Sequence, residues 1–331
     1  MKTKYFLFIL AIIISVFSLI ACGGGGGGGD DPDPPANWLC FTASADSTVS
    51  TNTKTDGTVS SAAPTLEYSK DDGTTWTDFE LSYYDALDNL ITAGTTVALA
   101  SGEKMYIRAK GTNTAFSDFA SGSDYRFIRF LLTGTIAASG NVMSLVDKDC
   151  KSTVIPSDFC FYILFQYCTS LTSAPELPAT TLTQVCYGDM FYGCTSLIAA
   201  PELPATTLAV ACYDGMFAEC SALTTVPTLP ATTLEEGCYS GMFDNCTSLV
   251  NAPEIKATTL ANSSCYGMFI RCVALAKITV HFTDWNTAGN ATDNWVEYIP
   301  AGGHFYCPAG LDTSVAGPNK NPTGWTIHEL P

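Results

Sequence analysis

Cys186-Tyr-Gly-Asp-Met-Phe-Tyr-Gly-Cys194-Thr-Ser-Leu197 is followed by Ile-Ala-Ala-Pro201-Glu-Leu-Pro-Ala-Thr-Thr-Leu208, and this pair of phrases recurs along the middle of the chain. The second cysteine of each copy stands at position 168, 194, 220, 246 or 272, a constant step of 26 residues. A fixed period of this length indicates a stack of repeated units, each too small to bury its apolar side chains alone.

The apolar residues of one unit have a helix-like spacing at its start and a strand-like spacing at its end. Cys186, Met190 and Cys194 are four residues apart, which favours one face of a short helix. Leu197 then opens a strand, and Pro201 ends regular strand pairing soon afterwards. A short helical turn joined to a Leu-led strand is typical of leucine-rich-repeat solenoids. The sequence therefore predicts such a solenoid, of about five 26-residue repeats, over residues 151–280.

The last repeat differs from the others, because Cys265 and Cys272 are seven residues apart instead of eight. We interpret this as a shortened helical half, as expected of a terminal unit that meets a cap. Residues 281–331 predict that cap, a small β structure. We expect Trp285, Trp295 and Trp325 to cover the apolar end of the stacked repeats. The alternative is that these rings form a flat surface that binds carbohydrate.

The segment before the repeats, residues 38–150, reads as short alternating strands separated by Gly, Asp and Ser clusters. This pattern predicts a small antiparallel β-sandwich. Ser69-Lys-Asp-Asp-Gly-Thr-Thr-Trp76 matches the Asp-box hairpin, a structural turn. The predicted fold class is therefore α+β: an all-β, sandwich-like domain, a leucine-rich-repeat solenoid and a small C-terminal β cap.

The N-terminus predicts a lipid anchor. Residues 1–21 have the form of a signal peptide, with an apolar run after two lysines, and Leu19-Ile-Ala-Cys22 resembles a lipoprotein cleavage site with Cys22 as the lipidated residue. Residues 22–37 read as a flexible Gly, Asp and Pro tether. By resemblance to Gram-negative lipoproteins, we expect attachment to the outer membrane, and the acidic residues after the glycines favour the outer face.

The composition argues against several functional classes. Fifteen Lys and Arg against 32 Asp and Glu give a net charge of −17, which argues against nucleic acid as a partner. The sequence contains no His-Glu-x-x-His helix, Gly-x-Ser-x-Gly elbow or phosphate-binding glycine loop. We therefore expect no enzymatic activity and no cofactor. The sequence leaves the oligomeric state open.

The cysteines of the repeats allow two interpretations. They are either small buried apolar residues stacked in two columns, or members of disulfides within each repeat, which an extracellular location permits. A metal site is not expected, because no Cys-x-x-Cys spacing occurs and the three histidines are scattered. The cysteines concerned are Cys160, Cys168, Cys186, Cys194, Cys212, Cys220, Cys238, Cys246, Cys265 and Cys272.

Two recurring sets of side chains are candidates for a binding stripe. The first is Glu176, Glu202 and Glu254, which stand at equivalent positions near the predicted strand end. If these carboxylates point outward, they favour a basic protein partner or, with added oxygen ligands, a cation. The alternative is that they serve only solubility. The second set consists of tyrosines, which either bind peptides or glycans or pack half-buried. They are Tyr187, Tyr213, Tyr239 and Tyr266.

The phrases Cys-Tyr-x-x-Met-Phe-x-x-Cys-Thr-Ser-Leu and Ala-Pro-Glu-Leu-Pro-Ala-Thr-Thr-Leu resemble the BspA-like leucine-rich-repeat surface lipoproteins of Bacteroides-type bacteria. The resemblance covers residues 160–280 most strongly and implies a cell-surface adhesion or binding protein without a catalytic site. The ligand it favours is a host or bacterial protein. The alternatives are a glycan-binding lipoprotein that serves an outer-membrane uptake system and a structural scaffold of the envelope.

Overall fold

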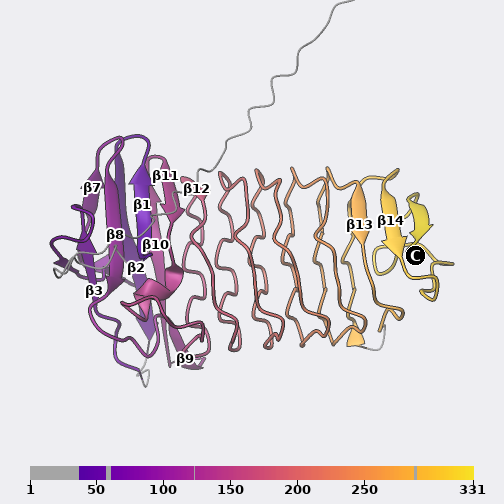
Figure 1. Ribbon diagram of the computed structural model, residues 1–331, viewed down its shortest axis with the longest axis horizontal. Helices are drawn as coiled ribbons and strands as arrows, with labels where there is room; N and C mark the ends of the chain where they lie inside the picture. The colour runs from indigo at the N-terminus through magenta and orange to yellow at the C-terminus, as the bar shows by residue number, and fades with distance from the viewer. Residues whose placement is uncertain (1–36, 57–60, 123, 287–288) are drawn as a thin grey trace, which may run out of the picture. The chain divides into compact units, whose positions relative to one another are not determined.

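The computed structural model describes residues 37–331 except 57–60, 123 and 287–288, and these described residues belong to one compact unit (Figure 1). Its regular elements are β1 (Leu39–Ala43), β2 (Ser47–Asp56), β3 (Leu66–Ser69), β4 (Thr77–Phe79), β5 (Tyr83–Tyr84), β6 (Leu90–Thr92), β7 (Val97–Leu99), β8 (Lys104–Ala109), β9 (Asp118–Ser121), β10 (Asp124–Thr133), β11 (Ile136–Ser139), η1 (Val142–Leu145), β12 (Leu171–Ser173), β13 (Lys277–Thr279), β14 (His304–Cys307) and β15 (Thr326–Glu329).

The first part of the chain forms two sheets that share one core. One has the strand order β4-β3-β8-β1-β11-β12, and the other has the order β6-β5-β2-β10-β9, with β7 beside β2. Along β10 every second side chain is buried, as expected for a strand with one face against a core. Phe41 of β1 meets Phe130 of β10 edge to face at 5.1 Å between ring centroids. Apolar side chains from both sheets therefore fill the space between them.

The core of the two sheets continues directly into the repeats. Strand β12, in the first repeat, pairs in parallel with β11, with Ile136 opposite Leu171. The ring of Phe165 in the same repeat stacks on Phe130 at 5.5 Å. In Figure 1 the repeat units then follow one another from β12 to β13.

The predicted helical half of each repeat is wrong, and with it the α+β class and the leucine-rich-repeat solenoid. Among the residues that the structure describes, helix is limited to short 3₁₀ segments such as η1, and the rest is β strand, turn and irregular backbone. The backbone leaves the right-handed helical region at every fourth residue: Val185, Asp189 and Gly193 have φ of 53°, 49° and 71°. A helix cannot contain such left-handed residues, so this segment is a run of tight turns.

Backbone hydrogen bonds alternate strictly along this turn run. The Met190 amide donates within its own unit to the Tyr187 carbonyl, at 3.3 Å, whereas the Phe191 amide donates to Met216 in the next unit at 2.9 Å. Every second amide thus closes a turn, and every other amide joins two units. The backbone of the turn run is therefore satisfied without a helix, and the units lie in register at their 26-residue period.

The period of four explains why the sequence suggested a helix. Residues at i, i+4 and i+8 lie only approximately on one face of a helix, because a helix has 3.6 residues per turn. In a chain that turns once every four residues, the same residues all point in one direction. In this turn run two adjacent side chains of each turn point inward, so Met190 and Phe191 are both fully buried. One inward column is made of phenylalanines whose rings lie 5.4 to 5.8 Å apart: Phe165, Phe191, Phe217, Phe243 and Phe269.

The last repeat is not shortened, which corrects the interpretation of its cysteine spacing. The Tyr239 amide bonds to the carbonyl of Ser264, and Phe243 stacks on Phe269, so the 26-residue register is intact. Ser264 occupies the position of the earlier cysteines, and Cys265 occupies that of the tyrosines. The seven-residue spacing of Cys265 and Cys272 therefore results from different side chains at two positions, and no residue of the repeat is missing.

Strand β13 of the last repeat pairs in parallel with β14, and β14 pairs in parallel with β15 (Figure 1). The three cap tryptophans are buried, with Trp295 fully enclosed and Trp285 and Trp325 3% and 7% exposed. Trp295 lies 6.1 Å from Phe269 and ends the phenylalanine column. These rings seal the repeats, and their burial rules out the carbohydrate platform.

Candidate binding face

The predicted glutamate stripe lies on the surface. Glu176, Glu202 and Glu254 are exposed, whereas the neighbouring Leu177 and Leu203 are buried. The alternation that the sequence left ambiguous is thus resolved, with leucines inward and carboxylates outward.

Each stripe carboxylate is held by a neighbour. The Asn37 amide donates to Glu176 at 2.5 Å, and the Thr228 hydroxyl donates to Glu202 at 2.8 Å. Glu254 lies 2.6 Å from the ring nitrogen Nε2 of His281. Asn37 and Thr228 are uncharged, so these hydrogen bonds fix the positions of the Glu176 and Glu202 carboxylates without pairing them with a cation.

A groove of about 290 Å³ runs between two of these glutamates. It is mainly apolar because its walls are proline rings, with Glu176 and Glu202 at the edge. The prolines are Pro175, Pro178, Pro201 and Pro204. We call these prolines and the two glutamates the proline–glutamate face.

The tyrosine stripe is not a surface feature. Tyr187, Tyr213 and Tyr239 are each 1% exposed and stack on one another at 6.0 and 6.2 Å. Tyr266 is 42% exposed, but it belongs to another column, because Cys265 stands at the tyrosine position. The proposed peptide-binding or glycan-binding row of these four side chains is therefore wrong.

The ten repeat cysteines are buried and free, and nine of them form two columns. Cys160, Cys186, Cys212 and Cys238 make the first column. The second column is Cys168, Cys194, Cys220, Cys246 and Cys272, and Cys265 lies apart in the tyrosine column. Each thiol of the second column donates to a backbone carbonyl of the preceding unit, as Cys220 does to Phe191 at 3.1 Å. Cys168, in the first unit, donates instead to Phe130 of β10. Burial raises the pKa of these thiols, to about 12 at Cys220, so they stay protonated and unreactive.

Two half-buried carboxylates lie together on the turn run. Burial, reinforced by the negative charge of Asp214, raises the pKa of Asp189 to about 6, while a hydrogen bond from Tyr162 opposes the shift. Burial also raises the pKa of Asp214, and the hydroxyl of Ser240 opposes that shift. The repeat pattern does not reveal this pair, because Asp189 and Asp214 are not at equivalent repeat positions.

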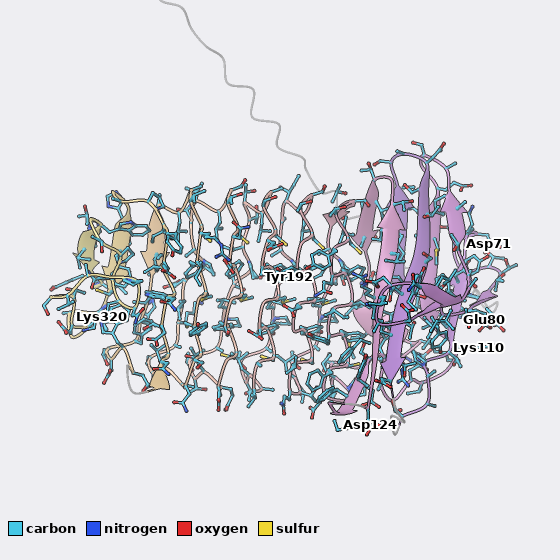
Figure 2. All side chains as sticks on the ribbon, turned by 180° about the vertical axis from the view of Figure 1, so that it is seen from behind. Asp71, Glu80, Lys110, Asp124, Tyr192 and Lys320 are labelled. Carbon is cyan, nitrogen blue, oxygen red and sulfur yellow. The ribbon has the colours of Figure 1, made fainter. Side chains whose placement is uncertain are left out.

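The Asp-box segment forms the predicted hairpin between β3 and β4. Asp71 accepts the Thr75 amide at 2.8 Å, and hydrogen bonds from Thr75 and Ser69 lower the pKa of Asp71 to about 2. Beyond the hairpin, Lys110 pairs with Asp78 at 2.7 Å close to Glu80 (Figure 2). These acids stabilise turns and surface pairs.

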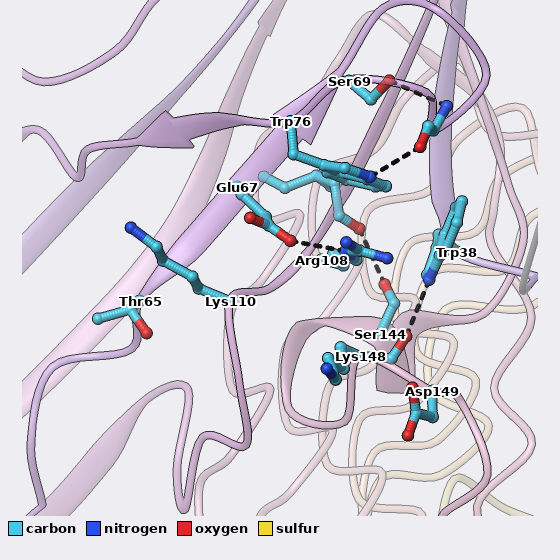
Figure 3. Close-up of polar contacts among 12 residues, drawn as sticks. Trp38, Thr65, Glu67, Ser69, Trp76, Arg108, Lys110, Ser144, Lys148 and Asp149 are labelled. Carbon is cyan, nitrogen blue, oxygen red and sulfur yellow. Dashed lines mark hydrogen bonds and ion pairs between the residues drawn. The ribbon is translucent and has the colours of Figure 1, made fainter.

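Tryptophans beside the hairpin enclose an arginine (Figure 3). The Arg108 guanidinium lies 3.7 Å from the ring centroid of Trp76 and 4.7 Å from that of Trp38, and its Nε is 2.8 Å from the carboxylate of Glu67. The Trp38 indole donates to the Lys148 carbonyl at 2.8 Å. Because Trp38 both packs on Arg108 and donates to the Lys148 carbonyl, this cluster fixes the start of the described chain to the sheet.

A second cavity, of about 320 Å³, lies where the second sheet meets the first repeat. Asp88 lies 2.9 Å from Lys54 and 3.7 Å from Arg129, and the amide of Asn52 donates to it at 3.2 Å. This cluster could not be recognised from the sequence, because its members come from strands and loops far apart in the chain.

The predicted lipid anchor cannot be compared with the structure. Cys22 and the signal peptide lie outside the described residues. Within the described ranges, no cluster of three or more His, Cys, Asp or Glu side chains is arranged to hold a metal ion. None of the described helices is long and apolar enough to cross a membrane.

Comparisons with protein-family models, with curated proteins and with solved structures find no match for this chain.

Proposed function

We propose that this protein is a non-catalytic, lipid-anchored cell-surface protein that binds extended, basic segments of partner proteins. The anchor is supported by the signal-like residues 1–21 before Cys22 and by the tether that follows. The resemblance of the repeat phrases to BspA-like surface lipoproteins supports the same location and a role in adhesion.

The proline–glutamate face is the observation that carries the binding proposal. Proline rings offer rigid apolar contact area, and an extended segment fits such a shallow groove better than a folded element does. Glu176 and Glu202 at the edge would pair with Lys or Arg of the partner. The net charge of −17 would speed the encounter with a basic partner and make it sensitive to salt.

A matched pair of double variants tests this binding mode. The probe is a fluorescent synthetic peptide with repeated Lys-Pro-Val, and its counterpart has Glu in place of Lys. Glu176→Gln with Glu202→Gln removes two charges from the face, and the control Glu235→Gln with Glu236→Gln removes two exposed charges from a different segment of a repeat.

Fluorescence anisotropy with the mature protein in detergent measures the affinity. We expect binding of the lysine peptide, about tenfold weaker in the face variant and nearly unchanged in the control. Equal affinity of the two double variants, or equal binding of the two peptides, would refute the use of this face.

Surface location is tested separately by protease treatment of intact cells, followed by detection of the repeats. Loss of the protein from intact cells, and release of a Cys22→Ala variant from the membrane, are the expected results. Protection until the outer membrane is opened would instead place the protein in the periplasm.

A further inference from the structure

Two of the three histidines meet on the C-terminal parallel sheet. His304 lies on β14 and His328 on the adjacent β15, and the ring nitrogens Nδ1 of His304 and Nε2 of His328 are 2.9 Å apart. In the strand register His328 is opposite Tyr306, so the two histidines are diagonal neighbours on one face of the sheet. That face is open to solvent, since His304 is exposed and His328 half-buried.

The position of one imidazole is fixed by an aromatic neighbour. Tyr306 stacks on His328 with 4.5 Å between ring centroids and an angle of 14° between the planes. Strand β14 is held between β13 and β15 in the sheet, and β15 pairs with β14 along four residues. The 2.9 Å separation is that of a hydrogen bond between the two rings, so a ligand that needs both nitrogens replaces this bond. The proton of the bond then moves to the outer nitrogen of its own ring, which leaves both facing nitrogens free. The strands and the contact with Tyr306 already hold the two rings side by side.

We propose that His304 and His328 form a binding site for a divalent transition-metal ion with right-angled coordination, such as Ni²⁺ or Cu²⁺. Neutral imidazole nitrogens bind such ions at about 2.0–2.1 Å, and two ligands at right angles are then about 2.9 Å apart. The two nitrogens have this separation. Square-planar and octahedral ions accept the right angle, whereas tetrahedral zinc would need a wider spacing of about 3.4 Å.

Water completes the coordination, because no third His, Cys, Asp or Glu joins the pair among the residues that the structure describes. Lys277 lies opposite His304 in the strand register, and its ammonium, 5.2 Å from the ring centroid of Tyr306, opposes a bound cation. Removing this charge is therefore expected to strengthen metal binding.

The experiment is calorimetric titration of the mature protein with Ni²⁺, which the buried thiols do not reduce. His281 is the matched control, because it is paired with Glu254 instead of with a second histidine. We expect one ion per chain. His304→Gln and His328→Gln should each weaken Ni²⁺ binding about tenfold or more, because the ion is then bound by one imidazole instead of two.

His281→Gln should bind as the wild type does, and Lys277→Gln should bind more tightly. Circular dichroism of each variant checks that the fold is retained. Unchanged Ni²⁺ affinity in both single variants, or loss of binding in His281→Gln alone, would overturn the site.

Discussion

Replacing Asp189 with asparagine should stabilise the protein at neutral pH. The carboxyl has a pKa of about 6 in the fold, because it is half-buried and close to Asp214. In the unfolded chain its pKa is the ordinary value of about 3.8–3.9. The fold therefore favours the protonated form, and the stability of the native state falls as pH rises from about 4 to about 6.

The size of the effect follows from the difference of about two pKa units, which corresponds to about 3 kcal/mol above pH 6. Asparagine keeps an acceptor for the Tyr162 hydroxyl and carries no charge. We expect Asp189→Asn to raise the free energy of unfolding by up to about 3 kcal/mol at pH 8, and by less than about 1 kcal/mol at pH 4.

Urea unfolding followed by circular dichroism at both pH values is the assay. Glu236→Gln, which removes an exposed charge from the same part of the chain, is the control and should change stability by less than about 0.5 kcal/mol. A gain for Asp189→Asn that is the same at pH 4 and pH 8, or a loss at pH 8, would refute the reasoning.

Three other substitutions test the packing of the repeats by the same urea assay. Gly215→Ala should cost about 1–3 kcal/mol, because φ is +59° and the added methyl would meet the Asp189 carboxylate; an unchanged midpoint would contradict the turn geometry. Phe217→Ala should cost about 3–5 kcal/mol, because the ring is fully buried between two phenylalanines; a cost below about 1 kcal/mol would argue against the column. Tyr213→Phe should preserve or raise stability by about 1 kcal/mol, because the buried hydroxyl has no hydrogen-bond partner among the described residues; a clear loss would show that it is bonded.

The sequence predicted the inward positions of the repeats better than their backbone. Met190 and Leu197 are buried as the repeat pattern indicated, because burial follows from hydrophobicity at a fixed period. The turn run was mistaken for a helix, because left-handed residues such as Val185 are not glycine and leave no sequence signal.

The candidate face was only partly predictable. The glutamates were identified from their repeat, but their direction depended on which neighbours entered the core. The pair His304 and His328 could not be recognised, because 24 residues separate them and only the parallel pairing of β14 and β15 brings them together.

The most direct test of the central structural claim is alkylation of the cysteines without a reducing agent, read by mass spectrometry. Stacked turn units with columns of free thiols predict that the ten repeat cysteines resist the reagent in the native protein and all react after unfolding in urea. Disulfides between Cys186 and Cys194 or their equivalents would leave these residues unmodified after unfolding. That result would contradict the columns, the turn register and the face built on them.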